Sequence, residues 1–375
     1  MSAPAYLLDG VRVPFGRTGR ALAGLTATEL GALPIAQLLH RHPDLALDAA
    51  LLGVVVQAGL GQNPARTAAL AGGLDPEVPA LTLNSVCLAS LESVCDAARR
   101  IAVGEGAAYL VGGFDSMSTG GRLGGDVDVV LHDGLLDVAS GRSMGVVSDR
   151  VNAELGISRE DQDAWAHGSH ARALAARDFL RDETVPVALP DGTSHTDDQG
   201  VRAESSVEAL AGLRPAFTPD GTITAGNASQ TADGASAGLV VSGEVLERTG
   251  AVPLARVVDW AFVAGPGTSL HLKPARAVRR VLARQGLSPA DVDVYEINEA
   301  FAGVAIASAR DLGVPGDVVN VHGGAVAVGH PLGASGFRLA LTAARALRAR
   351  NGRRAVATLC GGGGQGLAVL LETVA

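Results

Sequence analysis

The segment from Asn320 to Gly336, NVHGGAVAVGHPLGASG, constrains the fold of this chain more than any other segment. The apolar run at 318–321 predicts a strand, and the periodic apolar segment from Phe337 predicts a helix. Glycine is used where the backbone must approach another group closely or take a positive φ. A strand, a glycine turn and a helix in this order would expose His330 at the end of a sheet, where α/β folds bind ligands.

His330 by itself has a simpler explanation, because an isolated His-Pro pair is usually a hydrogen-bonded loop histidine. Spacing alone does not exclude that explanation. The longer segment GGAVAVGHPLGASG, however, resembles the active-site histidine segment of thiolases, the acyl-CoA acetyltransferases. A member of that family must also supply a nucleophilic thiol, an acid/base partner and an oxyanion site.

Composition places the chain among α/β proteins. Its 375 residues suggest two to three domains, and 47% hydrophobic residues, 3% aromatic residues and 49 glycines indicate a core of Ala, Val and Leu. A net charge of −9 argues against nucleic-acid binding, which needs a basic face. No apolar window is long enough to predict a membrane span, and the absence of a signal-like N-terminal segment predicts a cytoplasmic protein.

Three cysteines, Cys87, Cys95 and Cys360, form no CxxC pair, which argues against a disulfide scaffold and against a metal site. Cys87 follows a short strand and precedes a predicted helix, where peptide dipoles would lower its pKa and favour a thiolate. It also lies one turn before Leu91, so it could instead extend the buried face of that helix. Cys95 is predicted to lie in the core.

The segment around Cys87, TLNSVC, resembles the nucleophile segment Asn-x-x-Cys of thiolases. The chain departs from that pattern at Ala89-Ser90, where a Ser-Gly pair is usual, and has Leu88 beside the nucleophile; these changes predict a reshaped acyl pocket. GGFDSM similarly resembles the thiolase sequence Gly-Gly-x-Glu-Ser-Met, with Asp115 in place of glutamate.

Two further motifs, EINEAFAG and TLCGGGGQG, also resemble thiolase segments. Asn298 stands at a predicted strand-to-helix junction, where it could equally serve as a helix N-cap. Cys360 is followed by four glycines, which we interpret as close backbone approach to a ligand. The four motifs occur in the family's order, so the resemblance covers nearly the whole chain.

The resemblance implies duplicated, mixed-sheet α/β halves in a layered arrangement. The N-terminal half would comprise residues 1–117 with 235–250, and the C-terminal half residues 251–375. Residues 118–234 are rich in charges and turn signals, and are predicted to form an inserted loop domain that covers the coenzyme A site. Both halves look like weak copies of one pattern, with a reactive residue at the start of a helix.

The resemblance also implies a role for each catalytic residue. Cys87 would be the nucleophile, and neutral His330 would take its proton. Cys360 would exchange a proton with C2 of acetyl-CoA. One oxyanion would be held by His330 and a water on Asn298, and the other by the backbone amides of Cys87 and Gly362.

Within the predicted loop domain, Met144 matches the methionine near the acyl group, while Ser143 stands where many thiolases have histidine. Ser229 and Arg202 match positions that contact coenzyme A, Arg202 as a phosphate partner. An exposed surface charge explains Arg202 equally well.

Two departures in the C-terminal half leave the substrate open. HLKP, with Lys273, replaces the usual Gly-x-Gly-Pro, and Asp259 replaces a serine that some members have beside the coenzyme tail.

The sequence therefore predicts an acyl-CoA C-acyltransferase that condenses acetyl-CoA with an acyl-CoA, or cleaves 3-ketoacyl-CoA, through an acyl-cysteine. It predicts acyl-CoA substrates, no bound cofactor and a homodimer or homotetramer. One alternative is a ketoacyl-synthase-type condensing enzyme, which would lack Cys360. The other is a non-catalytic, thiolase-like acyl-CoA or lipid-binding protein, which would have lost a catalytic residue.

Overall fold

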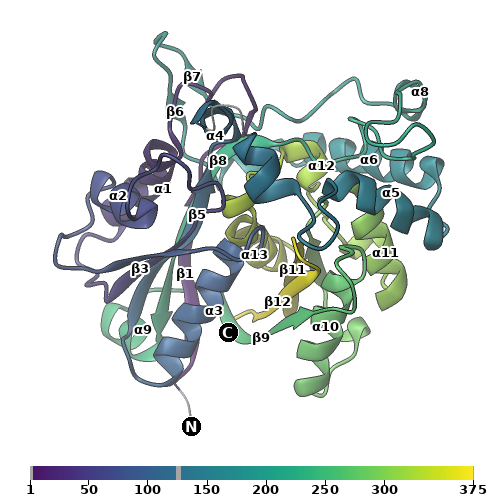
Figure 1. The fold of residues 1–375 in the computed structure, drawn as a ribbon. Helices are drawn as coiled ribbons and strands as arrows, with labels where there is room; N and C mark the ends of the chain where they lie inside the picture. The colour runs from purple at the N-terminus through teal and green to yellow at the C-terminus, as the bar shows by residue number, and fades with distance from the viewer. Residues whose placement is uncertain (1–2, 124–127, 375) are drawn as a thin grey trace.

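A computed structural model describes residues 3–123 and 128–374 (Figure 1). The strands of its large sheet are β1 (Ala5–Arg12), β2 (Gly16–Arg17), β3 (Ala49–Gly53), β4 (Ala80–Leu83), β5 (Ala108–Asp115), β8 (Ala232–Ser242), β9 (Ala255–Ala264), β10 (Val294–Ile297), β11 (Arg354–Gly361) and β12 (Gln365–Glu372). They are ordered β10-β11-β12-β9-β1-β8-β5-β3-β4, and β2 pairs with β8. The sheet contains both parallel and antiparallel pairs, which confirms the predicted mixed α/β class.

The two ends of this sheet repeat one topology. In the first, β3 runs parallel to β5, and the pairs β5–β8 and β8–β1 are antiparallel. In the second, β10 runs parallel to β11, and β11–β12 and β12–β9 are antiparallel. Antiparallel pairing of β1 with β9 joins the two halves. The weak duplication seen in the sequence is therefore present in the strand order.

The helices form layers with the two halves of the sheet (Figure 1). The main helices are α1 (Ala27–Arg41), α2 (Pro64–Ala71), α3 (Ala89–Ala102), α10 (Lys273–Arg284), α11 (Ala302–Leu312) and α13 (Leu332–Ala349). α3 and α13 share one apolar core with strands of both halves. α1 and α2 cover the outer face of the first half, and α10 and α11 cover that of the second.

β5 shows why the strands read as continuous apolar runs. Tyr109 and Val111 point into the core of α3 and α13, whereas Ala108 and Leu110 point into the core of α1 and α2. Because successive side chains alternate between two buried faces, both sets must be apolar.

The strand predicted at 318–321 is wrong. A 3-10 helix covers Gly316–Val318, and only Val319 bridges to β10, through Tyr295. Asn320 has a φ of 46°, which a strand does not allow. Its side chain instead forms hydrogen bonds with the backbone N–H and C=O of Ile297, at 2.8 and 2.9 Å. These two bonds take the place of the backbone hydrogen bonds that a paired strand would make with β10.

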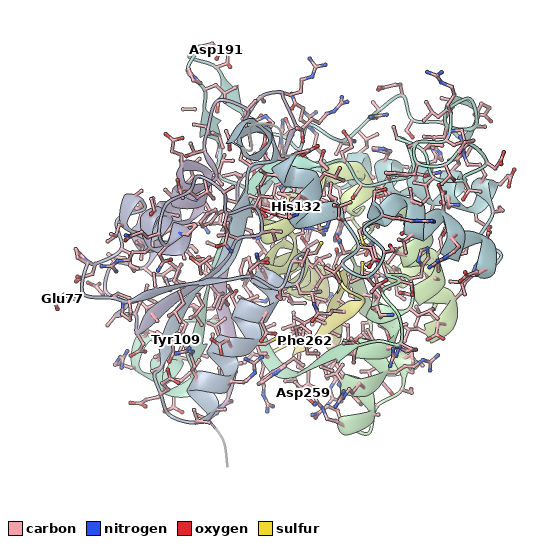
Figure 2. The ribbon with its side chains drawn as sticks, in the orientation of Figure 1. Glu77, Tyr109, His132, Asp191, Asp259 and Phe262 are labelled. Atoms are coloured by element: carbon pink, nitrogen blue, oxygen red, sulfur yellow. The ribbon has the colours of Figure 1, made fainter. Side chains whose placement is uncertain are left out.

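The segment between β5 and β8 lies across the sheet ends. It contains α4 (Met117–Leu123), a π-helix (Leu131–Leu135), α5 (Met144–Glu154), α6 (Arg159–Ala175), α7 (Arg177–Arg181), β6 (Val187–Ala188), β7 (Ser194–His195) and α8 (Val207–Ala211). A turn at Ala176 separates α6 from α7. Asp191 marks the tip of the β6–β7 hairpin at the top of Figure 2.

A buried ion-pair cluster ties this segment to the first half. Arg12 of β1 contacts Glu183 at 2.8 Å and Asp198 at 2.6 Å, and all three side chains are almost fully buried. In the described part of the chain, no helix is both long enough and apolar enough to cross a membrane.

Candidate active site

A cavity of about 140 Å³ opens where the two halves meet the segment between them. Cys87 enters it from the first half, and His330, Cys360 and Gly362 enter it from the second. Met144 and other residues of the intervening segment form the remaining wall. Four of the residues singled out in the sequence therefore surround one space.

Cys87 lies two residues before α3, after Val86 in a left-handed conformation with φ 55°. The backbone amides of Cys87 itself and of Gly362 donate hydrogen bonds to its sulfur. Burial nevertheless raises the pKa of the Cys87 thiol to about 12, because loss of hydration disfavours the thiolate more than these two donors favour it. The expectation that the helix start lowers this pKa is wrong, and Cys87 rests as a thiol.

The hydrogen bonds of His330 identify which ring nitrogen carries the proton. Ser335 Oγ donates its only proton to the carbonyl of Pro331 at 2.7 Å. The 2.6 Å contact between Ser335 Oγ and His330 Nδ1 must therefore have Nδ1–H as its donor. The other nitrogen, Nε2, is left unprotonated and accepts from Asn298 Nδ2 at 3.3 Å.

Burial also keeps the His330 ring neutral. It lowers the pKa of His330 to about 3, with a smaller contribution from the positive charge of Arg338. A neutral imidazole whose Nε2 is unprotonated can accept a proton, as general base catalysis requires.

Cys360 is the last side chain of β11 before the glycine turn, and it is buried. Burial raises the pKa of its thiol well above the usual range; the charge of Cys87 raises it further and that of Lys273 lowers it. Lys273 is the only lysine of the chain, and its ammonium donates to the carbonyl of Pro266 at 3.1 Å.

The four glycines after Cys360 are explained mainly by packing, which corrects the ligand-approach interpretation. Gly363 and Gly364 have φ of 74° and 71° in the connection from β11 to β12. A Cβ on Gly361 would lie 2.7 Å from Leu88, and one on Gly364 would lie 2.2 Å from a backbone oxygen. Only Gly362 faces the cavity, with its amide directed at Cys87.

Asn298 follows β10 directly and is fully buried. It is not a helix N-cap, since α11 begins at Ala302 with Phe301 at the cap position. Its Oδ1 accepts no hydrogen bond from a group that the structure describes. The side chain is therefore held against His330 rather than used to start a helix.

Two supporting residues were missed in the sequence. Ser335 sets the tautomer of His330 and stands five residues after it. Glu299, next to Asn298, accepts hydrogen bonds from Trp165 and Ser169 of α6 at 2.9 and 2.8 Å. Through these hydrogen bonds, Glu299 joins the second half to the segment that covers the cavity.

The residues expected to contact coenzyme A are divided between two hollows. Met144 and Ser229 line the cavity, and Ser229 Oγ donates to the carbonyl of Ala300 at 2.9 Å. Arg202 lines an adjacent hollow with Arg17, and the two spaces share Phe217, Ala228, Ser229 and Thr231. Arg202 forms no ion pair with any side chain in the described ranges, so its charge is available to a ligand.

Asp259 does not line the cavity that contains Cys87, and its expected effect on the coenzyme tail stays a prediction. Its carboxylate is held by Arg284 at 2.6 Å and by Gln285 at 2.9 Å. Figure 2 shows Asp259 far from His132, which belongs to the π-helix at the cavity.

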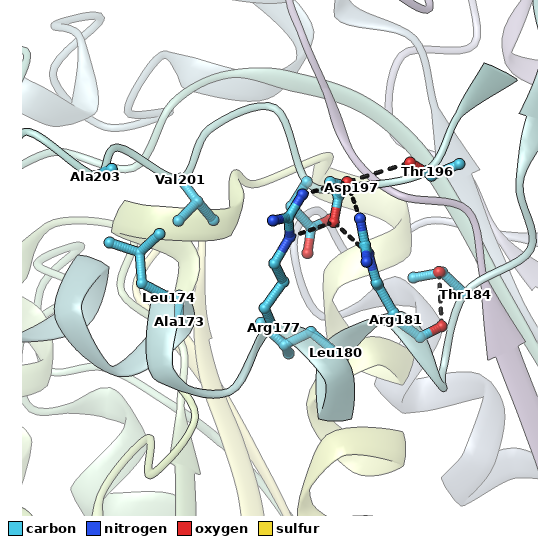
Figure 3. A pocket seen from close by; sticks show the side chains of 11 residues that line it. Ala173, Leu174, Arg177, Leu180, Arg181, Thr184, Thr196, Asp197, Val201 and Ala203 are labelled. Carbon is cyan, nitrogen blue, oxygen red and sulfur yellow. Dashed lines mark hydrogen bonds and ion pairs between the residues drawn. The ribbon is translucent and has the colours of Figure 1, made fainter.

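Another hollow, of about 260 Å³, lies beside α6 and α7 (Figure 3). Arg177 and Arg181 both turn toward Asp197, with Nε–Oδ1 distances of 3.1 and 2.7 Å. No thiol or imidazole is among the described residues that line this hollow, so it has no group for acyl transfer.

Comparison with known proteins agrees with this geometry. Residues 5–244 match the thiolase N-terminal domain, and residues 251–373 match the thiolase C-terminal domain. The chain is 42% identical to a probable acetyl-CoA acetyltransferase of Mycobacterium leprae (strain TN), over 99% of both chains. It is 40% identical to an acetyl-CoA acetyltransferase of Chromobacterium violaceum, over 96% of this chain and 97% of that one.

It is also 40% identical to a beta-ketoadipyl-CoA thiolase of Escherichia coli, over 99% of both chains. Both domain matches, the full-length relatives and a cavity that contains two cysteines and a neutral histidine lead to one conclusion: the chain belongs to the thiolase family.

Proposed function

We propose that this thiolase transfers acyl groups between coenzyme A thioesters, by condensing acetyl-CoA with an acyl-CoA or by cleaving 3-ketoacyl-CoA with free coenzyme A. One observation carries the proposal: Cys87, His330 and Cys360 line one cavity, and the hydrogen bonds of His330 leave Nε2 unprotonated. Nucleophile, base and second acid/base group are thus present together.

In the cleavage direction, Cys87 loses its proton to His330 Nε2 as its sulfur attacks C3 of the 3-ketoacyl-CoA. The bond between C2 and C3 then breaks, C2 receives a proton from Cys360, and acetyl-CoA leaves. The thiol of a second coenzyme A then gives its proton to the Cys360 thiolate and attacks the acyl-cysteine, and the Cys87 sulfur leaves and regains its proton from His330 as the shortened acyl-CoA is released. The backbone amides of Cys87 and Gly362 donate hydrogen bonds to the Cys87 sulfur in the resting site. During the reaction the same two amides stabilise negative charge on the oxygen of the acyl group.

The resting protonation states explain why attack and proton transfer are coupled. A thiol of pKa about 12 and an imidazole of pKa about 3 do not form an ion pair in the empty cavity. The Cys87 proton therefore moves to His330 as the bond to the carbonyl carbon forms, because that bond draws electron density from the sulfur and makes the thiol more acidic.

The alternatives lack a supporting observation. A ketoacyl-synthase-type enzyme would not need Cys360, and a non-catalytic binding protein would not need the His330 tautomer. The homo-oligomeric state and the cytoplasmic location stay predictions, as do the coenzyme contacts of Arg202, Ser229 and Met144.

The first test is thiolysis of acetoacetyl-CoA by the wild type and by Cys87→Ala, followed as loss of the 3-ketoacyl thioester. We expect turnover by the wild type and a loss of at least about 1,000-fold in the variant. Cys95→Ala is the matched control, because Cys95 is buried in α3 and lies outside the cavity. Equal turnover by wild type and Cys87→Ala would refute the assigned nucleophile.

A further inference from the structure

The space next to Cys87 has an apolar wall. Cys87 packs against an apolar cluster that includes the buried Leu332, and the partly buried side chains of Val86, Val130 and Leu135 pack against the same cluster. Leu131 and Leu135, both from the π-helix, line the cavity directly. The group attached to the Cys87 sulfur would therefore lie against hydrocarbon.

No charged side chain lines the cavity among residues 3–120 and 128–374. His330 is neutral at physiological pH because burial lowers its pKa to about 3. The hydroxyl of Ser229 donates to Ala300, and that of Ser143 accepts from the amide of Val146 as the N-cap of α5. The described lining of the cavity thus offers an incoming anion no cationic side chain.

These features make the cavity selective for the end of the acyl chain. An acyl group that ends in a methyl gains from burial of each methylene, about 0.8 kcal/mol or roughly fourfold in binding. An acyl group that ends in a carboxylate must leave water without gaining a cationic partner among the described lining residues, which costs several times more.

We propose that this thiolase takes neutral, aliphatic 3-ketoacyl-CoA substrates and rejects those whose acyl chain ends in a carboxylate. This inference rests on the proposed function, because it concerns the acyl group that thiolysis leaves on Cys87. Cleavage of 3-oxohexanoyl-CoA leaves a butyryl group there, and cleavage of 3-oxoadipyl-CoA leaves a succinyl group. The two groups differ only at their last carbon, methyl against carboxylate.

The substrate test compares kcat/KM for acetoacetyl-CoA, 3-oxohexanoyl-CoA and 3-oxoadipyl-CoA at pH 8. We expect 3-oxohexanoyl-CoA to exceed 3-oxoadipyl-CoA by at least about 100-fold. Comparable values for these two, with acetoacetyl-CoA also cleaved, would overturn the inference and leave the proposed function intact. No turnover of any of the three would instead refute the proposed function, and the inference with it.

A charge-adding variant tests whether the apolar wall is the cause. Leu131 lines the cavity and is 37% exposed, so Leu131→Arg adds a cation to the wall without filling the core. We expect it to reduce the preference for 3-oxohexanoyl-CoA over 3-oxoadipyl-CoA by at least about tenfold.

Val103→Arg is the matched control, because Val103 is 78% exposed at the far end of α3. It should leave the preference as in the wild type. A preference that is unchanged in Leu131→Arg, or changed equally by Val103→Arg, would contradict the assignment of selectivity to the cavity wall.

Discussion

The hydroxyl of Ser335 decides which nitrogen of His330 carries the proton. Because its own proton goes to the carbonyl of Pro331, it can only accept from Nδ1–H. The unprotonated Nε2 is the nitrogen that faces Asn298. The His330 ring itself lines the cavity. A single buried hydroxyl therefore controls whether the histidine can act as a base.

Ser335→Ala should lower kcat for acetoacetyl-CoA thiolysis by at least about tenfold, because Nδ1–H loses its acceptor and the other tautomer becomes accessible. KM should change little, since Ser335 does not line the cavity. Ser308→Ala is the control: Ser308 is also buried and donates to a backbone carbonyl, that of His271. Wild-type kcat in Ser335→Ala would show that the tautomer is set by another group.

At this scale the motifs predicted which residues meet and that His330 is neutral, but not that Cys87 rests as a thiol. Cys87, His330, Cys360 and Gly362 were all identified from short segments, and all four line the cavity. The raised pKa of Cys87 could not be predicted, because it depends on burial by segments far away in the sequence. Ser335 was within a recognised motif, yet its role depends on a contact one helical turn away.

α3 and α13 bring the nucleophile and the base together. Cys87 precedes the first helix, His330 precedes the second, and the two helices pack against each other in the central core. The contact is close at Gly336, where a Cβ would lie 2.5 Å from the backbone nitrogen of Leu91. The separation of these helices thus sets the spacing of the catalytic pair.

Gly336→Ala should therefore impair both stability and activity. The added methyl must push α3 and α13 apart, which we expect to cost about 1–3 kcal/mol of unfolding free energy and to lower kcat at least about tenfold. Denaturant unfolding and acetoacetyl-CoA thiolysis measure the two effects. Gly24→Ala is the control, because nothing lies within 4 Å of its added Cβ. Equal behaviour of the two variants would contradict this account.

Helices and strands were predictable where one hydrophobic period ran through the segment. The prediction failed where a single residue interrupted that period. The helix predicted after Cys87 and the helix predicted over the periodic segment from Phe337 are both present. The strand at 318–321 failed because Asn320 takes a left-handed conformation and bonds Ile297 through its side chain. An isolated sequence does not show which asparagine will do so.

Buried histidines link the stability of the whole molecule to pH. His170, His271 and His330 are all buried, and burial lowers the pKa of the first two to about 4 and of the third to about 3. Each pKa is lower in the folded than in the unfolded chain. Between these values the unfolded chain binds more protons, so stability is lost as the pH falls below about 6.5.

His271→Gln isolates one such contribution. His271 Nε2–H donates to Asn152 Oδ1 at 2.8 Å, a bond that a glutamine amide can replace. Between pH 6.5 and 4 the wild type should lose about 3 kcal/mol more unfolding free energy than the variant. Buried acids such as Asp115, whose pKa is raised to about 7, act in the opposite direction but equally in both proteins. Parallel stability curves from urea unfolding would refute this assignment.

The position of β8 has a consequence for synthesis of the chain on the ribosome. β8 pairs with β5 on one side and β1 on the other, and before β9 is made it is the sole partner of β1 among the described strands. The N-terminal half therefore cannot close its sheet until residues 232–242 have emerged, after the whole segment that covers the cavity. The first strand to be translated waits for more than 200 residues, while α3 and its nucleophile already have β3 and β5 to pack against.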